Sequence, residues 1–392
     1  MQKGRLTMRA AIGHRKAPEA VRSDRGQILV VAAFAMVAMV AMAALVLEGG
    51  NAYAQQRSTQ NGVDATANAG AVILAERLGG ATHTDADVAS TVAAFAAANG
   101  VSTQTAGLST QTAYYTNITG QFLSTAGVVV ADKSAAAVVG GGTIPSGAQG
   151  VSVDGMKRFA TTFGRAIGFN SFDAGATATA VTGRLEGGAF IPVVFPINIV
   201  DCEQNGDIGV GVMPWAVSQP PASAGGTPVG QEYIVPLCRS GPGSFMILDL
   251  DPNKTCAEEI SDPPQISWNL PTWVATDNGN DCAKKMLDGV NALHGKIVFI
   301  PVCDVACVRG QGSNLEYHIV KVAAFFLDPV TPMSDSNNPN NSMCQGGGGL
   351  TPIRGNGSSS CLRGWFINYI TTGPVGAGTI DTWDSIGVQL IK

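Results

Sequence analysis

The chain is 392 residues long, with 45% hydrophobic residues, 14% charged residues, 49 glycines and a net charge of −5. This length accommodates a membrane anchor plus one large or two modest domains, and this composition excludes disorder throughout the chain. The charge is uneven, because residues 1–25 hold seven basic and two acidic residues, which leaves 17 basic and 27 acidic residues, a net charge of −10, in the remainder.

The basic segment 1–25 has two interpretations. Short basic tails bind nucleic acid in some proteins, whereas basic residues beside an apolar span mark its cytoplasmic side. A long apolar segment follows this tail directly. We therefore expect a cytoplasmic tail, with no nucleic acid among the partners.

Residues 27–47 read QILVVAAFAMVAMVAMAALVL and carry no charge. A helix of about 20 such residues crosses a hydrocarbon core of about 30 Å. We predict a single transmembrane helix over residues 26–48, which leaves the bulk of the chain outside the cytoplasm. The alternative is a secretory signal peptide cleaved after Ala43 or Ala44, although the apolar region of a signal peptide is typically only about 7 to 15 residues long.

Two features of this segment bear on self-association. Small side chains recur every three residues, at Ala35, Ala38, Ala41 and Ala44, where a second helix can approach closely; an Ala-rich span without a partner is the alternative. Glu48 ends the segment, and an intramembrane carboxylate is costly unless it is paired. It either pairs with a neighbouring subunit or reaches interfacial water, and we expect the second arrangement.

Short motifs surround the apolar segment in a fixed order. An Arg-Gly-Gln triplet enters it, Glu-Gly-Gly leaves it, and a Tyr and a small-residue helix follow. The residues that carry these motifs are Arg25, Gly26, Gln27, Glu48, Gly49, Gly50, Tyr53, Gln60, Asn61, Asp64, Ala65, Ala69, Gly70 and Ala71. Over about residues 25–76 the chain thus resembles the N-terminal region of TadE/TadG-like proteins of the tight-adherence (Flp) pilus assembly machinery.

The resemblance implies a function and limits it. It implies a non-catalytic, membrane-anchored structural or accessory component of the pilus or a related secretion system, with pilus-assembly or secretion proteins as partners and no cofactor. Prepilin processing is not expected, because Val31 stands where processed pilin-like subunits have Glu, five residues after the cleavage-site Gly. The Asp-x-Ser-x-Ser run that begins the metal site in larger TadG relatives is also absent from the sequence.

The segment after the span favours helix. We predict that the first helix continues outward to Gly79-Gly80 and that a second begins at a cap on Thr84 or Asp85 and ends at Gly100. Together they give a helical stalk over residues 49–100.

Residues 101–392 have the texture of an α+β head whose sheet is mostly antiparallel, with long loops. A division near residues 185–200 is an option. Helix is expected at 155–167, where residues 159–183 also resemble a later segment of the family. Strands are expected at 112–123, 127–132, 176–182, 189–200, 244–250, 296–302, 315–327 and 363–371, and surface loops at 216–230 and 333–360. Pro196 suits an edge strand.

The eight cysteines all follow residue 200, on the side predicted to be extracytoplasmic. An even count there favours disulfides, whose connectivity sequence does not give. They are Cys202, Cys238, Cys256, Cys282, Cys303, Cys307, Cys344 and Cys361. Zinc is the alternative for the close pair Cys303 and Cys307, but no second close pair complements it.

Other chemistry-bearing patterns are weak. Asp249, Asp251 and Asn253 resemble the start of a calcium loop, but the spacing to Glu259 favours a capped turn. No hydrolase, metalloprotease or nucleotide-binding motif emerges, so we expect no enzyme activity. The second functional hypothesis is a membrane-tethered module that binds glycan or protein. Its site would be lined by tryptophans, namely Trp215, Trp268, Trp273, Trp365 and Trp383.

Overall fold

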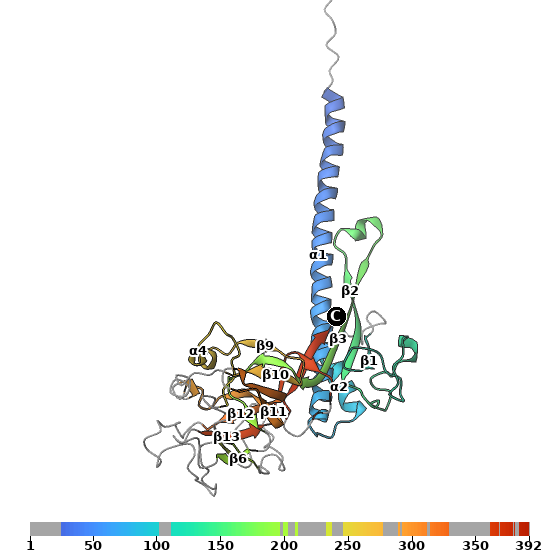
Figure 1. Cartoon of the computed structure of the whole chain (residues 1–392). Coiled ribbons are helices and arrows are strands. Elements are labelled where there is room, and N and C mark those ends of the chain that lie inside the picture. The colour runs from blue at the N-terminus through green and yellow to red at the C-terminus, as the bar shows by residue number, and fades with distance from the viewer. Residues whose placement is uncertain are drawn as a thin grey trace, which may run out of the picture. The chain divides into compact units, whose positions relative to one another are not determined.

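The computed structural model describes residues 25–101, 111–196, 199–202, 208–210, 233–236, 246–276, 289–290, 292–311, 314–328, 361–367, 369–378, 380 and 384–391. The chain divides into two compact units, Met1–Tyr53 with Ala160–Ser171 and Ala54–Phe159 with Phe172–Lys392. The first helix, α1 (Arg25–Leu78, labelled in Figure 1), supplies residues to both units.

The first unit combines the apolar part of α1 with the turn between two long strands. This turn contains a short 3₁₀ helix, η2 (Gly164–Ile167). Within the described part of the chain, α1 is the one helix long and apolar enough to cross a membrane, as judged by its length and composition. It begins at the end of the basic tail, as the sequence predicts.

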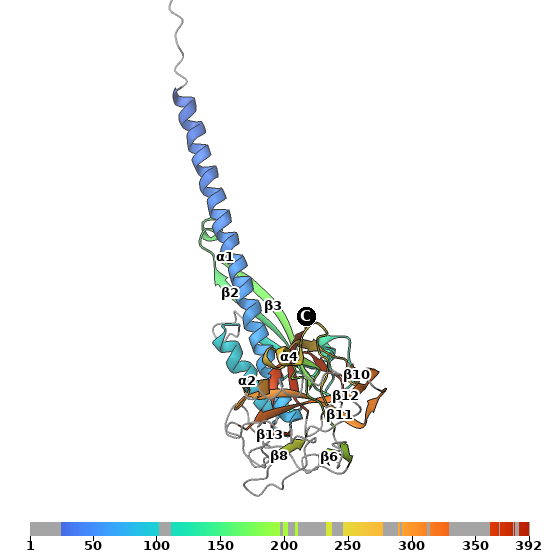
Figure 2. The same cartoon turned by 60° about the vertical axis from the view of Figure 1, so that its left-hand side comes forward.

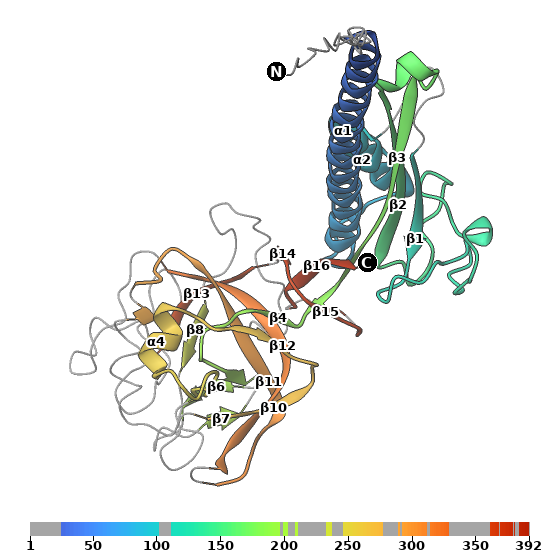
Figure 3. The same ribbon diagram turned by 90° about the horizontal axis from the view of Figure 1, so that it is seen from above.

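In the second unit, the remainder of α1 and helix α2 (Asp85–Ala98) pack on one sheet (Figure 3). The sheet has the order β1-β2-β3-β16-β14, with β15 paired to β3. Its pairings are antiparallel apart from the parallel pair of β14 and β16. The strands are β1 (Gln111–Thr116), β2 (Gly150–Ala160), β3 (Ser171–Leu185), β14 (Ile370–Thr372), β15 (Val375–Gly376) and β16 (Ile386–Ile391).

A second sheet in the same unit has the order β5-β11-β12-β13-β8, with β10 paired to β12. Its long central strands, β11 and β12, are labelled in Figure 2. The pairing of β5 with β11 is parallel and the others are antiparallel. The strands are β5 (Phe195–Pro196), β8 (Tyr233–Pro236), β10 (Thr272–Ala275), β11 (Ile297–Arg309), β12 (Glu316–Leu327) and β13 (Cys361–Ile367).

Short elements accompany the two sheets. Helix α4 (Cys256–Ser261) and the 3₁₀ helix η1 (Lys133–Ala135) are each shorter than two turns. Two further strand pairs join β4 (Gly187–Ala189) to β9 (Gln265–Ser267) and β6 (Ile199–Cys202) to β7 (Ile208–Val210).

Each sheet has its own hydrophobic core. The first core lies between the helices and the first sheet and includes Val63, Leu74 and Val92, all at most 2% exposed. The second gathers aromatic side chains, with Phe195, Phe325 and Phe366 in mutual T-shaped ring contacts. Aliphatic helix side chains therefore line the first core, and aromatic side chains gather in the second.

A buried carboxylate joins α2 to the first sheet. Asp85, which is 5% exposed, accepts hydrogen bonds from the Tyr115 hydroxyl at 2.6 Å and from the backbone N–H groups of Gly140 and Gly142 at 2.9 and 2.6 Å. Burial raises the pKa of Asp85, but these three donors outweigh it and leave the pKa below its usual value. Burial, followed by the bond to Asp85, raises the pKa of Tyr115.

The predicted fold class is confirmed: a long apolar helix precedes a β-rich, mostly antiparallel region. Both helix ends near Gly79 and Gly100 and the cap at Thr84 are confirmed. Strands are found within the predicted ranges 176–182, 296–302 and 315–327. Pro196 does lie on the edge strand β5. The domain boundaries stay a prediction.

Four secondary-structure predictions are wrong. Residues 155–160 belong to β2, and only the 3₁₀ turn η2 follows where a helix was expected. Residues 127–132 and 246–248 make isolated bridges and no strand. The expected strand at 189–200 is broken into β4, β5 and β6. The expected loops 216–230 and 333–360 lie outside the described residues.

Candidate functional site

The apolar part of α1 is a continuous exposed surface. Its large side chains are 52–74% exposed from Ile28 to Leu47. Soluble monomers rarely expose contiguous apolar patches larger than a few hundred Å². In a bilayer the same side chains meet hydrocarbon, and the helix satisfies its own backbone hydrogen bonds. By its length and composition, this part of α1 can cross a membrane.

Glu48 follows this surface directly and has partners within its own chain. Its carboxylate accepts hydrogen bonds from the backbone N–H of Thr162 at 3.1 Å and of Phe163 at 3.0 Å. The side chain is partly buried. Neither interpretation from sequence, a neighbouring subunit or interfacial water, included this partner, because 114 residues separate Glu48 from Thr162.

The turn that meets Glu48 is closed by its own backbone. Thr161 N–H donates to the Asn170 carbonyl at 3.2 Å, and Phe169 N–H donates to the Gly164 carbonyl at 2.9 Å. Gly168 has a φ of 93°, in the left-handed region that glycine tolerates. A closed turn of this kind holds two adjacent N–H groups toward one acceptor. We call residues 161–170 the hairpin tip.

The polar motif residues of α1 attach the helix to β3. Gln60 donates to the Asp64 carboxylate at 2.7 Å, one helical turn along, and to the Thr177 carbonyl at 3.3 Å. Gln56, just upstream, donates to the Gly175 carbonyl at 2.7 Å. These bonds satisfy carbonyl groups of β3, so the amides serve packing.

The small motif residues let α1 approach its neighbours closely. A Cβ placed on Gly70 would lie 2.9 Å from Val92 Cγ2 and 3.1 Å from Val151 Cγ2, which is too close. The flanking Ala69 and Ala71 are buried. The small-residue pattern is therefore a packing requirement at a junction of α1, α2 and β2.

The remaining motif residues lie away from this junction. A Cβ on Gly49 or Gly50 would meet nothing within 4 Å. Tyr53 is 66% exposed, Asn61 is exposed, and Ala65 is partly buried. The triplet Arg25, Gly26 and Gln27 forms the first residues of α1, and its side chains lie outside the described part.

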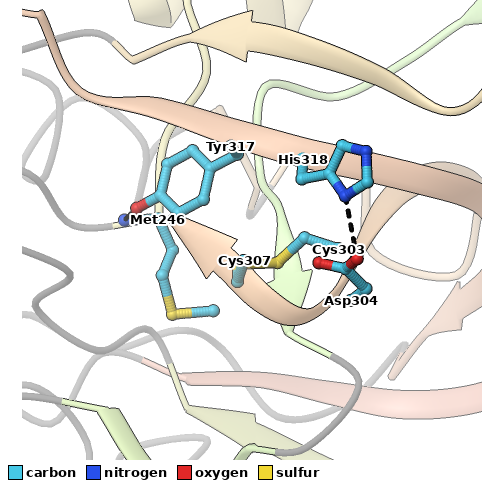
Figure 4. The surroundings of a disulfide bond; sticks show 6 residues. All are labelled: Met246, Cys303, Asp304, Cys307, Tyr317 and His318. Carbon is cyan, nitrogen blue, oxygen red and sulfur yellow. Dashed lines mark hydrogen bonds and ion pairs between the residues drawn. A yellow bond between two sulfur atoms is a disulfide. The ribbon is translucent and has the colours of Figure 1, made fainter. Parts of the chain in front are cut away.

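The structure pairs two of the cysteines that were candidates for disulfides. Cys303 and Cys307 are bonded to each other, with a Cα–Cα distance of 5.1 Å, which favours a disulfide over zinc for this pair (Figure 4). Between Cys303 and Val308, β11 advances five residues while β12 advances two, from Ile319 to Tyr317. The disulfide closes this excursion of the strand.

The other cysteines are described only in part. Cys256, the first residue of α4, is disulfide-bonded. The backbones of Cys202 and Cys361 lie in β6 and β13. Cys238, Cys282 and Cys344 lie outside the described residues, and their pairing stays a prediction.

Polar and aromatic groups beside the excursion bind one another. His318 Nδ1 lies 2.8 Å from Asp304 Oδ2, as Figure 4 shows. The imidazole stacks on Trp273 with ring centroids 4.6 Å apart, and the Arg309 guanidinium lies 4.1 Å from the centroid of the same ring. Arg309 also pairs with Glu316. No sequence motif predicts this cluster, because its residues come together only through the pairing of β10 and β11 with β12.

The calcium-like run is a capped turn, as predicted. The Asp251 carboxylate accepts from the Asn253 N–H at 3.0 Å, and Glu259 accepts from the Leu250 N–H at 3.0 Å. Thr255 and Glu258 form a capping box at the start of α4. These carboxylates cap backbone groups.

The tryptophans described are packed against other side chains. Trp268 lies 4.9 Å from Phe190, centroid to centroid, and Trp365 lies 6.1 Å from Phe326. Trp215 and Trp383 lie outside the described residues.

Comparison with known proteins assigns the N-terminal part of this arrangement. Residues 26–72 match the Tad family, described as Flp pilus-assembly TadE/G-like. The matched range covers the exposed apolar surface, Glu48 and the junction around Gly70. No curated protein and no solved structure matches the chain. The N-terminal region is therefore TadE/TadG-like, and this likeness connects the chain with Flp pilus assembly.

Proposed function

We propose that the chain is a non-catalytic, membrane-anchored accessory component of the tight-adherence (Flp) pilus assembly apparatus or a related secretion system. The observation that carries the proposal is the family match over residues 26–72, which includes the apolar helix surface. Its partners would be proteins of that apparatus in the same membrane.

The orientation we propose follows from charge and cysteine placement. Residues 1–25 hold seven basic residues before the span, which favours a cytoplasmic N-terminus. The disulfide between Cys303 and Cys307 supports an oxidising compartment for the β-rich region. Both arguments give a single-pass protein with its bulk outside the cytoplasm.

A structural role fits the interactions of the polar groups described above. The carboxylates of Glu48, Asp85 and Glu259 all accept backbone N–H groups. Trp273, one of the tryptophans of the binding-module hypothesis, already stacks with His318 and Arg309. We therefore favour an assembly component over a glycan-binding module.

The experiment is crosslinking of the tagged full-length chain in its native membrane, followed by identification of the captured proteins. The proposal predicts enrichment of the pilus secretion ATPase and the inner-membrane platform relative to an unrelated single-pass protein of equal abundance. Capture of no pilus component, with the chain present in the membrane, would count against it.

A further inference from the structure

The hairpin tip carries exposed aromatic and basic side chains at the point where the apolar helix surface ends. Phe163 is 40% exposed and Phe169 is 56% exposed. Arg165, between them, is also exposed. Two phenylalanines exposed on one short turn are more informative than a single exposed apolar residue, because together they form a local apolar patch.

The hydrogen bonds of Glu48 fix the tip at one level along α1. The last large apolar side chain is Leu47, and Glu48 binds the N–H groups of Thr162 and Phe163. These residues belong to the same compact unit. If residues 28–47 lie in hydrocarbon, Glu48 lies at the edge of the hydrocarbon. The Phe163 backbone then lies at the same depth, because its N–H donates to Glu48.

That level in a bilayer is the headgroup region, which has a characteristic chemistry. Ring side chains are favoured there because they bury apolar area near the acyl boundary, and an arginine can extend to lipid phosphate while its stem stays apolar. The tip presents both kinds of group on one turn. Its closed backbone leaves few unsatisfied polar groups to desolvate.

We propose that the hairpin tip is a second membrane contact, in which Phe163 and Phe169 enter the interfacial region of the bilayer and Arg165 binds lipid phosphate. The occupant is the lipid surface, because the tip is continuous with the apolar surface of α1. The proposal rests on the proposed membrane anchoring.

The test places a tryptophan at the tip of the full-length chain in lipid nanodiscs. The variant Phe169→Trp is compared with the unsubstituted chain, so that native tryptophan emission is subtracted. Acyl-brominated lipid should quench the added emission strongly. The matched control is Phe95→Trp on α2, since Phe95 is 46% exposed; its quenching should be at least about twofold weaker, because it lacks the tie to the end of the span.

A second measurement addresses Glu48 without altering the tip. Glu48→Ala should speed hydrogen exchange at the Thr162 and Phe163 amides roughly fivefold, the effect of losing about 1 kcal/mol of hydrogen bonding. In the Phe169→Trp background, Glu48→Ala should also weaken quenching of the added tryptophan. If Phe169→Trp fails to fold, Phe163→Trp takes its place in the quenching test, and the exchange measurement on Glu48→Ala alone is unaffected.

The outcomes separate this proposal from the anchor itself. If alkaline carbonate extracts the chain from native membranes, the anchoring and the tip contact both fail. If the chain stays in the membrane but Trp at 169 is quenched no more than Trp at 95, only the tip contact is overturned. Shielding of position 169 in native membranes but not in lipid-only nanodiscs would overturn the assignment of lipid as the occupant and indicate a protein partner instead.

Discussion

The hydrogen bonds of Asp85 give the sharpest prediction about stability. Asp85→Ala removes a 5%-exposed carboxylate and leaves the Tyr115 hydroxyl buried without its acceptor. A stranded buried donor costs about 2 kcal/mol, and loss of the two amide bonds from Gly140 and Gly142, which water partly replaces, adds about 1 kcal/mol. We expect the free energy of unfolding to fall by about 3 kcal/mol.

A double-mutant cycle isolates the pair that dominates this cost. Tyr115→Phe alone should cost about 1.5 kcal/mol, because the carboxylate keeps its two amide donors. In the Asp85→Ala background the same change should instead recover up to about 2 kcal/mol, since it removes the stranded hydroxyl. Urea unfolding of the full-length chain in nanodiscs, followed by far-UV circular dichroism, measures all four species. Additive effects would refute the reasoning.

The same carboxylate predicts a dependence on pH. The pKa of Asp85 is lower in the folded chain than its usual value, because three donors favour the charged form. Its contribution is therefore complete above the unfolded pKa of about 3.9 and is lost as the pH falls through the folded value. The stability difference between the unsubstituted chain and Asp85→Ala should stay constant above about pH 5 and shrink as the pH falls below about 4 toward the folded pKa. A difference that stays constant over the whole range would contradict the assignment.

The remaining predictions concern packing and the disulfide. Gly70→Val should destabilise the fold by roughly 1–3 kcal/mol, because it overpacks the junction. Gly49→Ala, whose new Cβ meets nothing within 4 Å, should stabilise the helix by up to about 1 kcal/mol. Thermal melting measures both variants, and equal effects would contradict the packing account. Replacing Cys303 and Cys307 together with serine should cost about 2 kcal/mol, the chain-entropy value for so short a loop. Unchanged urea midpoints under non-reducing conditions would show that the bond does not constrain the unfolded chain.

The parts of the structure set by local pattern were predictable. The apolar run, the helix end at Gly79 and the edge position of Pro196 each follow from a few adjacent residues. The β2 error has a tertiary cause. Met156 and its basic neighbours favour helix in isolation, but Gly155 pairs with Gln111 of β1, so sheet pairing overrides propensity.

The candidate site was predictable in its residues but not in its contacts. The family motif identified Glu48 and Gly70, yet their partners Thr162 and Val151 are far along the chain. The disulfide of Cys303 was likewise one of many pairings until the β11 excursion placed the two sulfurs together. Pattern identifies such residues, and long-range packing decides what they meet.

Surface pilus number is the measurement that tests the central claim most directly. Deletion of the gene should abolish or strongly reduce Flp pili counted by electron microscopy, and the full-length chain should restore them. A version in which residues 26–48 are replaced by a cleavable signal peptide should reach the same compartment without restoring pili. Normal pili in the deletion strain would contradict the account.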